Sequence, residues 1–156
     1  MIQIREATSL GAIEIVRELF REYGNLPNVN IAQHEFAGLP GEYAPPTGAL
    51  LVAMDEQDGA GCVAMRRFDP MTCEMKRLYV RPKYRSQGIG KGLVRAIIAR
   101  AQELGYEQMR LDTRGWMQSA QAVYRSIGFH EIPPYLNETV PGTMYFELDL
   151  TQGARD

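Results

Sequence analysis

The segment from Glu74 to Lys91 constrains the fold of this chain more than any other part of its sequence. Residues 74–80 mix β-branched, aromatic and apolar side chains, which predicts a strand. Pro82 ends that strand because proline lacks the N–H that a sheet requires. Apolar residues then recur with a period of about 3.6 from Ile89 to Leu104, which predicts an amphipathic helix that Gly105 terminates.

The glycine turn (Arg85–Lys91) between this strand and this helix predicts an anion site. Its glycines let the backbone approach a ligand closely, and several N–H groups point into one concavity at the positive end of the helix dipole. Residues 76–100 carry eight of the 17 Lys and Arg residues and none of the 19 Asp and Glu residues, although the net charge is −2. We therefore expect a phosphate to bind here, whereas the overall charge argues against nucleic acid as a partner.

The spacing of the glycines excludes two common phosphate motifs. Gly92 follows Lys91 where a P-loop requires Ser or Thr, and Gly88, Gly90 and Gly92 give G-x-G-x-G where a dinucleotide fingerprint requires G-x-G-x-x-G. The spacing that fits is Arg-x-x-Gly-x-Gly, from Arg85 to Gly90, and with it the segment resembles the GNAT superfamily of N-acetyltransferases.

The resemblance implies acetyl-coenzyme A (acetyl-CoA) as the cosubstrate and no metal cofactor. In this family the turn holds the pyrophosphate of the coenzyme, and the main chain at the end of the preceding strand pairs with its pantetheine arm. An N–H near Leu78 then faces the acetyl carbonyl. The residues expected to bind the coenzyme are Leu78, Tyr79, Val80, Arg85, Ser86, Gln87, Gly88, Ile89, Gly90 and Lys91.

Tyr124 is the expected general acid. The run from Ala120 to Phe129 matches the family pattern A-x-x-x-Y-x-x-x-G-F, in which the tyrosine hydroxyl meets the coenzyme sulfur. A phenol with a pKa of about 10 stays protonated at pH 7 and can donate to a thiolate. One departure from the family is Met117, which stands where an asparagine often contacts the coenzyme, and the bulky Trp116 beside it is expected near the site.

Glu74 is the expected general base. It stands fourteen residues before Gly88, the offset at which some members of the family place a glutamate that deprotonates the amine. Strand alternation predicts that it shares a face with Lys76, Leu78 and Val80. Two alternatives stay open, since many members use a chain of water molecules and Glu74 could instead pair with a neighbouring cation.

The rest of the chain predicts a single α/β domain over residues 1–150 and a disordered tail over 151–156. Strands are expected at 2–6, 49–54, 61–68, 72–80, 109–113, 130–132 and 143–150, and helices at about 10–23, 31–37, 89–104 and 117–126. The strand at 109–113 must run parallel to the one at 72–80 because a whole helix separates them. This order predicts a GNAT-like mixed, mostly antiparallel sheet of six or seven strands with helices on both faces.

The composition of the chain limits where we expect the protein to be located and what state we expect for its cysteines. No apolar run is long enough for a membrane span and the N-terminus has no signal-peptide pattern, so we expect a cytoplasmic protein without a membrane partner. Cys62 and Cys73 lack metal-ligand spacing and are expected to be reduced. The oligomeric state stays open, with a homodimer as one alternative because members of the resembled family often dimerise.

The expected activity is direct transfer of an acetyl group from acetyl-CoA to a primary amine of a small molecule or a peptide N-terminus. The irregular segment 24–48 is expected either to form a wall of the acceptor pocket or to be a surface loop. Acidic residues in and near the expected acceptor wall, Glu35, Glu42 and Glu138, hint at a cationic acceptor. Two rival functions are a non-catalytic acyl-CoA-binding sensor and another nucleotide-phosphate binder.

Overall fold

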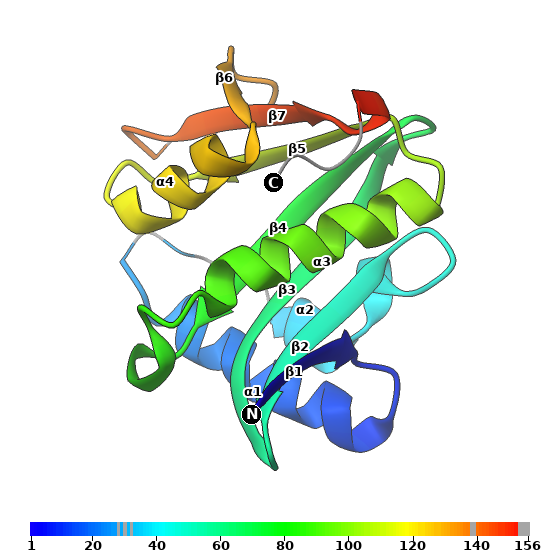
Figure 1. Ribbon diagram of the computed structural model, residues 1–156, viewed down its shortest axis with the longest axis vertical. Coiled ribbons are helices and arrows are strands. Elements are labelled where there is room, and N and C mark those ends of the chain that lie inside the picture. The colour runs from blue at the N-terminus through cyan, green and yellow to red at the C-terminus, as the bar shows by residue number, and fades with distance from the viewer. Residues whose placement is uncertain (28, 30, 32, 138–139, 153–156) are drawn as a thin grey trace.

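One open mixed sheet of seven strands forms the centre of the molecule (Figure 1). The computed structural model describes residues 1–27, 29, 31, 33–137 and 140–152. Within these residues the strand order is β1-β2-β3-β4-β5-β7-β6. The strands are β1 (Ile2–Glu6), β2 (Ala49–Asp55), β3 (Asp58–Asp69), β4 (Thr72–Val80), β5 (Gln108–Thr113), β6 (His130–Ile132) and β7 (Met144–Asp149). The helices are α1 (Leu10–Gly24), α2 (Gln33–Ala37), α3 (Ile89–Glu103) and α4 (Gln118–Ile127).

Helices cover both faces of the sheet, as the sequence predicts. One apolar cluster joins α3 and α4 to one face and includes Leu93, Ile97 and Tyr124. A second cluster joins α1 to the other face through Val16, Leu19 and Phe20, which recur at the spacing of one side of a helix. Figure 1 shows α3 crossing in front of the sheet and α1 lying behind it.

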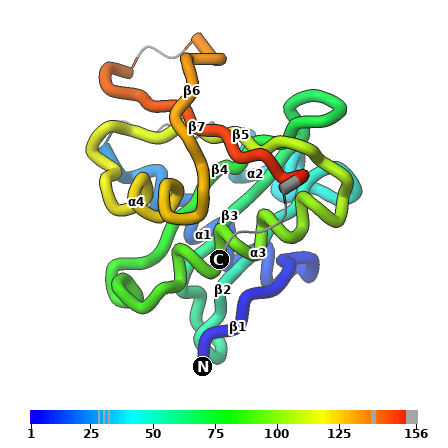
Figure 2. Tube along the Cα trace, turned by 45° about the horizontal axis from the view of Figure 1, so that its top comes forward, coloured from blue at the N-terminus to red at the C-terminus, as the bar shows by residue number. Residues whose placement is uncertain are grey.

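The strands β4 and β5 run parallel, as expected, but they pair over only three positions. Their register starts at Thr72 with Gln108 and ends at Glu74 with Arg110. Beyond this point β5 remains paired with β7 and β4 remains paired with β3, so β4 and β5 separate from each other. The gap between these two strands has the shape of a V (Figure 1). Figures 1 and 2 both place the green segment before α3 and the yellow helix α4 at the open side of this V.

A β-bulge in β4 changes which side chains face each helix layer. Arg77 has a φ of 61°, and the register with β3 shifts between Lys76 and Tyr79. The extra residue reverses the alternation beyond it. Leu78 and Val80 therefore pack in the α3 cluster, whereas Tyr79 packs in the α1 cluster. Glu74 alternates with Cys73 and Met75 of the α3 cluster, so its side chain lies on the α1 face. The prediction that Glu74 shares a face with Leu78 and Val80 is wrong for this reason.

The predicted elements otherwise match closely. The strand at 72–80 has the expected bounds, α3 starts at Ile89, and Gly105 follows that helix with a φ of 89°. The predicted helix at 31–37 is shorter and begins at Gln33. Thr151 lies in a 3-10 turn (Leu150–Gln152), and the rest of the predicted tail, 153–156, lies outside the described residues. None of the described helices combines the length and apolarity needed to span a membrane.

Candidate active site

The glycine turn presents unpaired backbone N–H groups at the N-terminus of α3. Ser86 and Gly88 have φ angles of 66° and 79°, and Gly88 precedes the first helical residue. The first helical hydrogen bond runs from the amide of Gly92 to the carbonyl of Gly88 at 3.0 Å. Within the described residues, the amides of Ile89, Gly90 and Lys91 make no backbone hydrogen bond, and no side chain caps the helix. The turn can therefore bind an anion.

The cations near the turn divide into paired and unpaired side chains. Lys76, Arg77, Arg81 and Arg100 each form an ion pair with a carboxylate. In contrast, Lys83, Arg85 and Lys91 form no ion pair with any residue that the structure describes, and the Nε of Arg85 donates to the carbonyl of Val80 at 3.1 Å. Three positive charges without an ion-pair partner among the described residues thus belong to the glycine turn or lie within two residues of it in sequence, which favours a polyanionic ligand.

A cavity of about 200 Å³ lies in the V between β4 and β5. Its walls include Met75 to Leu78 of β4, Leu111 to Arg114 at the end of β5, and three residues of or next to α4, namely Met117, Ala120 and Tyr124. Tyr23, Val29 and Leu136 line it as well. Met75, Lys76 and Leu78 follow the last paired position of β4, so backbone groups on that edge are not used by β5.

Tyr124 reaches the cavity from α4. Its ring packs against Phe129 and Phe146 with centroid distances of 5.7 and 6.1 Å, which fixes the direction of the side chain. The hydroxyl makes no hydrogen bond within the described residues. Burial raises the pKa of Tyr124 above its ordinary value, so the phenol is protonated at neutral pH and can donate a proton to a group in the cavity.

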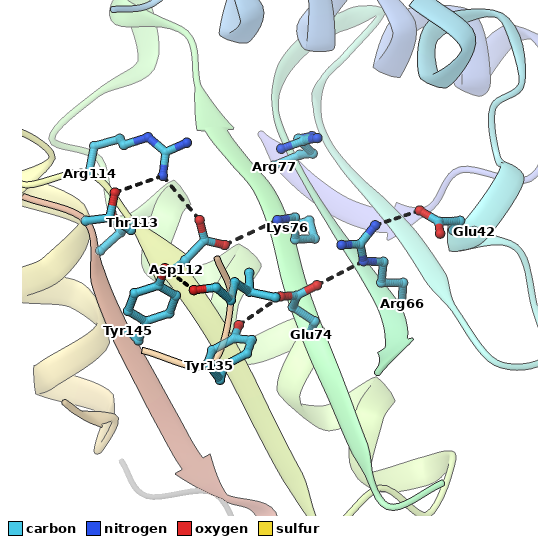
Figure 3. A network of polar contacts seen from close by, with 12 residues as sticks. Glu42, Arg66, Glu74, Lys76, Arg77, Asp112, Thr113, Arg114, Tyr135 and Tyr145 are labelled. Atoms are coloured by element: carbon cyan, nitrogen blue, oxygen red, sulfur yellow. Dashed lines mark hydrogen bonds and ion pairs between the residues drawn. The ribbon is translucent and has the colours of Figure 1, made fainter. Parts of the chain in front are cut away.

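Glu74 is almost completely buried, with 1% of its surface exposed. The Nε of Arg66 donates to one carboxylate oxygen at 2.9 Å, and the hydroxyl of Tyr135 donates to the other at 2.8 Å (Figure 3). Arg66 also pairs with Glu42 at 2.6 Å. Glu74 is not among the residues that line the cavity, and it pairs with a cation from β3 and not with its strand neighbours.

A second ionic network does lie at the cavity. Asp112 of β5 accepts hydrogen bonds from Lys76 Nζ at 3.2 Å and from Arg114 Nη1 at 3.3 Å (Figure 3). Arg77 of β4 donates through Nε and Nη2 to both oxygens of Glu35, at 2.8 and 3.0 Å. All but Glu35 line the cavity. The sequence places Glu35 in an acidic acceptor wall but indicates no role in the site for Asp112, Arg114 and Tyr135. The side chains of this network meet only after β4, β5 and the connecting segments have packed together.

The remaining predicted residues divide between the cavity and other parts of the molecule. Leu78 lines the cavity, whereas the hydroxyl of Tyr79 donates to Glu22 of α1 at 3.1 Å. Met117 lines the cavity but its neighbour Trp116, which is 44% exposed, does not. The roles assigned to Leu78, Tyr79, Val80 and the glycine turn in binding the coenzyme stay predictions.

The acidic residues expected to form a wall for a cationic acceptor are engaged elsewhere. Glu35 is neutralised by Arg77 and Glu42 by Arg66, and neither carboxylate lines the cavity. Glu138 lies outside the described residues. The described residues therefore do not support a cation-binding acidic wall.

Comparison with known proteins places the sequence in one family. The sequence profile of the Acetyltransferase (GNAT) family matches residues 12–129. An N-acetyltransferase of Schizosaccharomyces pombe is 39% identical over 140 residues, which cover 88% of this chain and 86% of that protein. The range matched by the family profile includes β4, the glycine turn, β5, α3 and α4, and with them every described residue that lines the cavity except Leu136.

Two solved structures share the fold at low sequence identity. An acetyltransferase of the GNAT family from Staphylococcus aureus superimposes with a TM-score of 0.80 and 22% identity, covering 96% of this chain and 99% of that one. The yncA protein of Salmonella typhimurium, solved with its cofactor acetyl-CoA, superimposes with a TM-score of 0.73 and 18% identity, covering 96% and 94%.

Proposed function

Since this chain belongs to the acetyltransferase (GNAT) family, we propose that it moves an acetyl group directly from acetyl-CoA to a primary amine. Family membership gives the class of enzyme, an N-acetyltransferase, and supports acetyl-CoA as the acetyl donor. The finer proposal is that the acceptor is a small molecule or a peptide N-terminus. It is supported by the size of the cavity, about 200 Å³, which is below the range of roughly 300–1,000 Å³ typical of sites for drug-sized ligands.

The residues of the glycine turn and β4 suit acetyl-CoA. The unpaired amides of Ile89, Gly90 and Lys91 would hold the pyrophosphate, and Lys83, Arg85 and Lys91 would neutralise it. The edge of β4 from Met75 to Val80, which β5 leaves open, would pair with the pantetheine arm. When bound, the coenzyme supplies the activated acetyl thioester.

Two groups of the chain would then act on the thioester. The backbone N–H of Leu78 would donate a hydrogen bond to the acetyl oxygen and stabilise the negative charge that develops there. The hydroxyl of Tyr124 would donate its proton to the departing sulfur. The high pKa of Tyr124 keeps this proton in place over the physiological range, because burial disfavours the charged phenolate.

The acceptor amine must lose a proton, and Glu74 is the proposed base. Its carboxylate is held by Arg66 and Tyr135 and does not line the cavity, so it would act through an intervening water molecule. This combines the two routes that the sequence leaves open, a glutamate and a water chain.

One observation carries the proposal: β4 separates from β5 directly before the glycine turn, and Tyr124 lines the resulting cavity. Calorimetric titration with acetyl-CoA should give saturable binding, and an amine panel assayed for free thiol should give turnover. Coenzyme binding without thiol release for any amine would favour a sensor, and complete displacement of the coenzyme by ATP would favour a different nucleotide-phosphate binder. Absence of heat and of a thermal shift at millimolar acetyl-CoA would contradict the proposal.

A further inference from the structure

The charged side chains that line the cavity are mostly cationic. Lys76, Arg77 and Arg114 line it, and Asp112 is the one carboxylate among the described lining residues. Each of these four side chains is largely buried, with between 10 and 15% of its surface exposed. Charged groups in such an environment interact strongly with an entering ion because water screens them poorly.

Arg77 retains one edge of its guanidinium for a ligand. Its Nε and Nη2 donate to Glu35, which leaves Nη1 without a hydrogen bond to any residue that the structure describes. Nη1 is not fully buried either, because it is absent from the buried polar atoms that lack a partner among the described side chains. A guanidinium held rigidly on one edge and open on the other is suited to bind a carboxylate.

The backbone and a carboxylate hold Arg77 in this position. Its φ of 61° places a non-glycine residue in the left-handed region, at the bulge that reverses the alternation of β4. Strained residues of this kind cluster at ligand sites. Burial alone would raise the pKa of Glu35, but its hydrogen bonds with Arg77 and the charge of that residue outweigh burial and lower it. Glu35 is therefore ionised and fixes the guanidinium over a wide pH range.

Asp112 is placed to bind the amine end of the same ligand. Lys76 and Arg114 each donate a single hydrogen bond to a different oxygen of this carboxylate. Each carboxylate oxygen can accept a second hydrogen bond, which an ammonium group of the acceptor would provide. Positive and negative groups in one small cavity match a molecule that carries both charges.

From this arrangement we infer that the acceptor is a zwitterion of the amino-acid type, with its carboxylate bound by Nη1 of Arg77 and its amine beside Asp112. The inference rests on the proposed function, because it names the acceptor of that reaction. It narrows the proposed acceptor to a small molecule and excludes simple polyamines and peptide N-termini as preferred acceptors, since these offer no carboxylate near the reacting amine.

The test compares free amino acids with their carboxamides in a thiol-release assay. Glycine, L-alanine, L-glutamate and L-lysine are each assayed with acetyl-CoA beside the matching α-carboxamide, which removes the charge of the α-carboxylate and keeps the α-amine. We expect at least one free acid to exceed its amide in kcat/KM by about tenfold or more, the effect of a hydrogen bond to a charged group. Arg77→Gln should reduce this ratio toward one by raising KM for the acid, while KM for acetyl-CoA stays within about twofold.

Two further variants keep the test interpretable. The double variant Arg77→Gln/Glu35→Gln removes both charges, so no unpaired carboxylate remains if the single variant fails to fold. Arg110→Gln is the matched control, because Arg110 pairs with Glu147 on the neighbouring strands and does not line the cavity. It should leave the acid-to-amide ratio unchanged. The amines of the acids and of the amides differ in basicity, but this difference is the same for the native protein and for every variant. It therefore cancels when their acid-to-amide ratios of kcat/KM are compared.

The outcomes separate this inference from the proposed function. Equal turnover of acids and amides, turnover of amines without a carboxylate only, or coenzyme binding with no turnover of this panel overturns the inference. In all three cases the acetyl-CoA site of the proposed function still stands. A protein that does not bind acetyl-CoA at all would contradict the proposed function itself, and the inference with it.

Discussion

The two sides of the open V bind their ligands through different kinds of groups. The proposed coenzyme side consists of the β4 edge and the glycine turn, a continuous segment from Met75 to Lys91 whose binding groups are mainly backbone amides. The proposed acceptor side consists of side chains from segments far apart in sequence, including Tyr23, Arg77, Asp112 and Leu136. A site made of main-chain groups depends on local conformation, whereas a site made of side chains depends on how the whole sheet packs.

This difference implies different responses to mutation. On the coenzyme side, most substitutions leave the binding amides in place, so only a change of charge or of backbone conformation should abolish binding. On the acceptor side, one side chain carries each interaction, so a single truncation should alter specificity. The following predictions test this contrast.

The largest effect is expected from a negative charge in the glycine turn, in the variant Gly88→Asp. The added Cβ meets no atom within 4 Å, and Asp tolerates the φ of 79° better than most residues. Its carboxylate would occupy the helix N-terminus where the pyrophosphate is proposed to bind. We expect the Kd for acetyl-CoA to rise on the order of 10³-fold, because like charges repel and the amides are already engaged. Calorimetry measures this directly.

Gly88→Asn is the matched control, because Asn has the same shape without the charge. It should weaken binding by no more than about tenfold, since its amide oxygen can also accept from the free N–H groups but carries no charge that repels the pyrophosphate. The melting temperature should be no lower for Asp than for Asn, because a carboxylate stabilises a helix N-terminus. Equal loss of affinity in the two variants would show that conformation, and not charge, governs this side of the V.

The same contrast explains which parts of the molecule could be predicted from sequence. The strand at 72–80, the start of α3 at Ile89 and the left-handed Gly105 follow from local patterns, and the structure confirms them. The glycine turn could be proposed as an anion site because its groups lie within one short segment. The reversal of β4 at Arg77 has no signal in the sequence, since a β-bulge depends on the register with β3.

The acceptor side was largely missed for a related reason. Glu35 was read as part of an acidic wall, yet it pairs with Arg77, 42 residues away in sequence. Asp112 was part of a predicted strand with no role assigned. Both contacts require long-range packing, which composition and spacing do not specify. Tyr124 was found only because its position in α4 matches a family pattern, so its role still needs a direct test.

A smaller but still large effect is expected for Tyr124→Phe, which removes the proposed proton donor at the meeting point of the two sides. We expect kcat to fall by about 10²-fold, in the range for loss of a general acid, with KM for acetyl-CoA nearly unchanged. Burial raises the pKa of Tyr124, so the native enzyme should show no loss of rate from its deprotonation below about pH 10. Steady-state rates between pH 6 and 10 measure both.

Tyr106→Phe serves as the control for that experiment. Its hydroxyl donates to the carbonyl of Thr47 at 2.6 Å, away from the cavity lining, so its loss should lower stability but not kcat. An unchanged kcat in Tyr124→Phe across the pH range would remove this tyrosine from the chemistry and leave it as part of the apolar cluster.

The smallest effect is expected for Glu74→Gln, because a base that acts through water is partly replaceable. We expect kcat/KM for the amine to fall by about tenfold, through kcat, with KM for the amine and KM for acetyl-CoA nearly unchanged. Arg66 keeps Glu42 as a partner at 2.6 Å, so this variant does not leave an isolated buried cation, and the fold should survive.

Tyr135→Phe separates a catalytic from a positioning role of Glu74. It removes the other hydrogen bond to that carboxylate, at 2.8 Å, while leaving the carboxylate itself in place. If Glu74 is the base, Glu74→Gln lowers kcat, whereas Tyr135→Phe keeps the carboxylate and leaves kcat nearly unchanged. If Glu74 only holds the segment around Tyr135 over the cavity, both variants raise KM for the amine equally and neither lowers kcat. The second result would make the acceptor side a purely binding surface, with deprotonation left to water, and would complete the contrast with the coenzyme side.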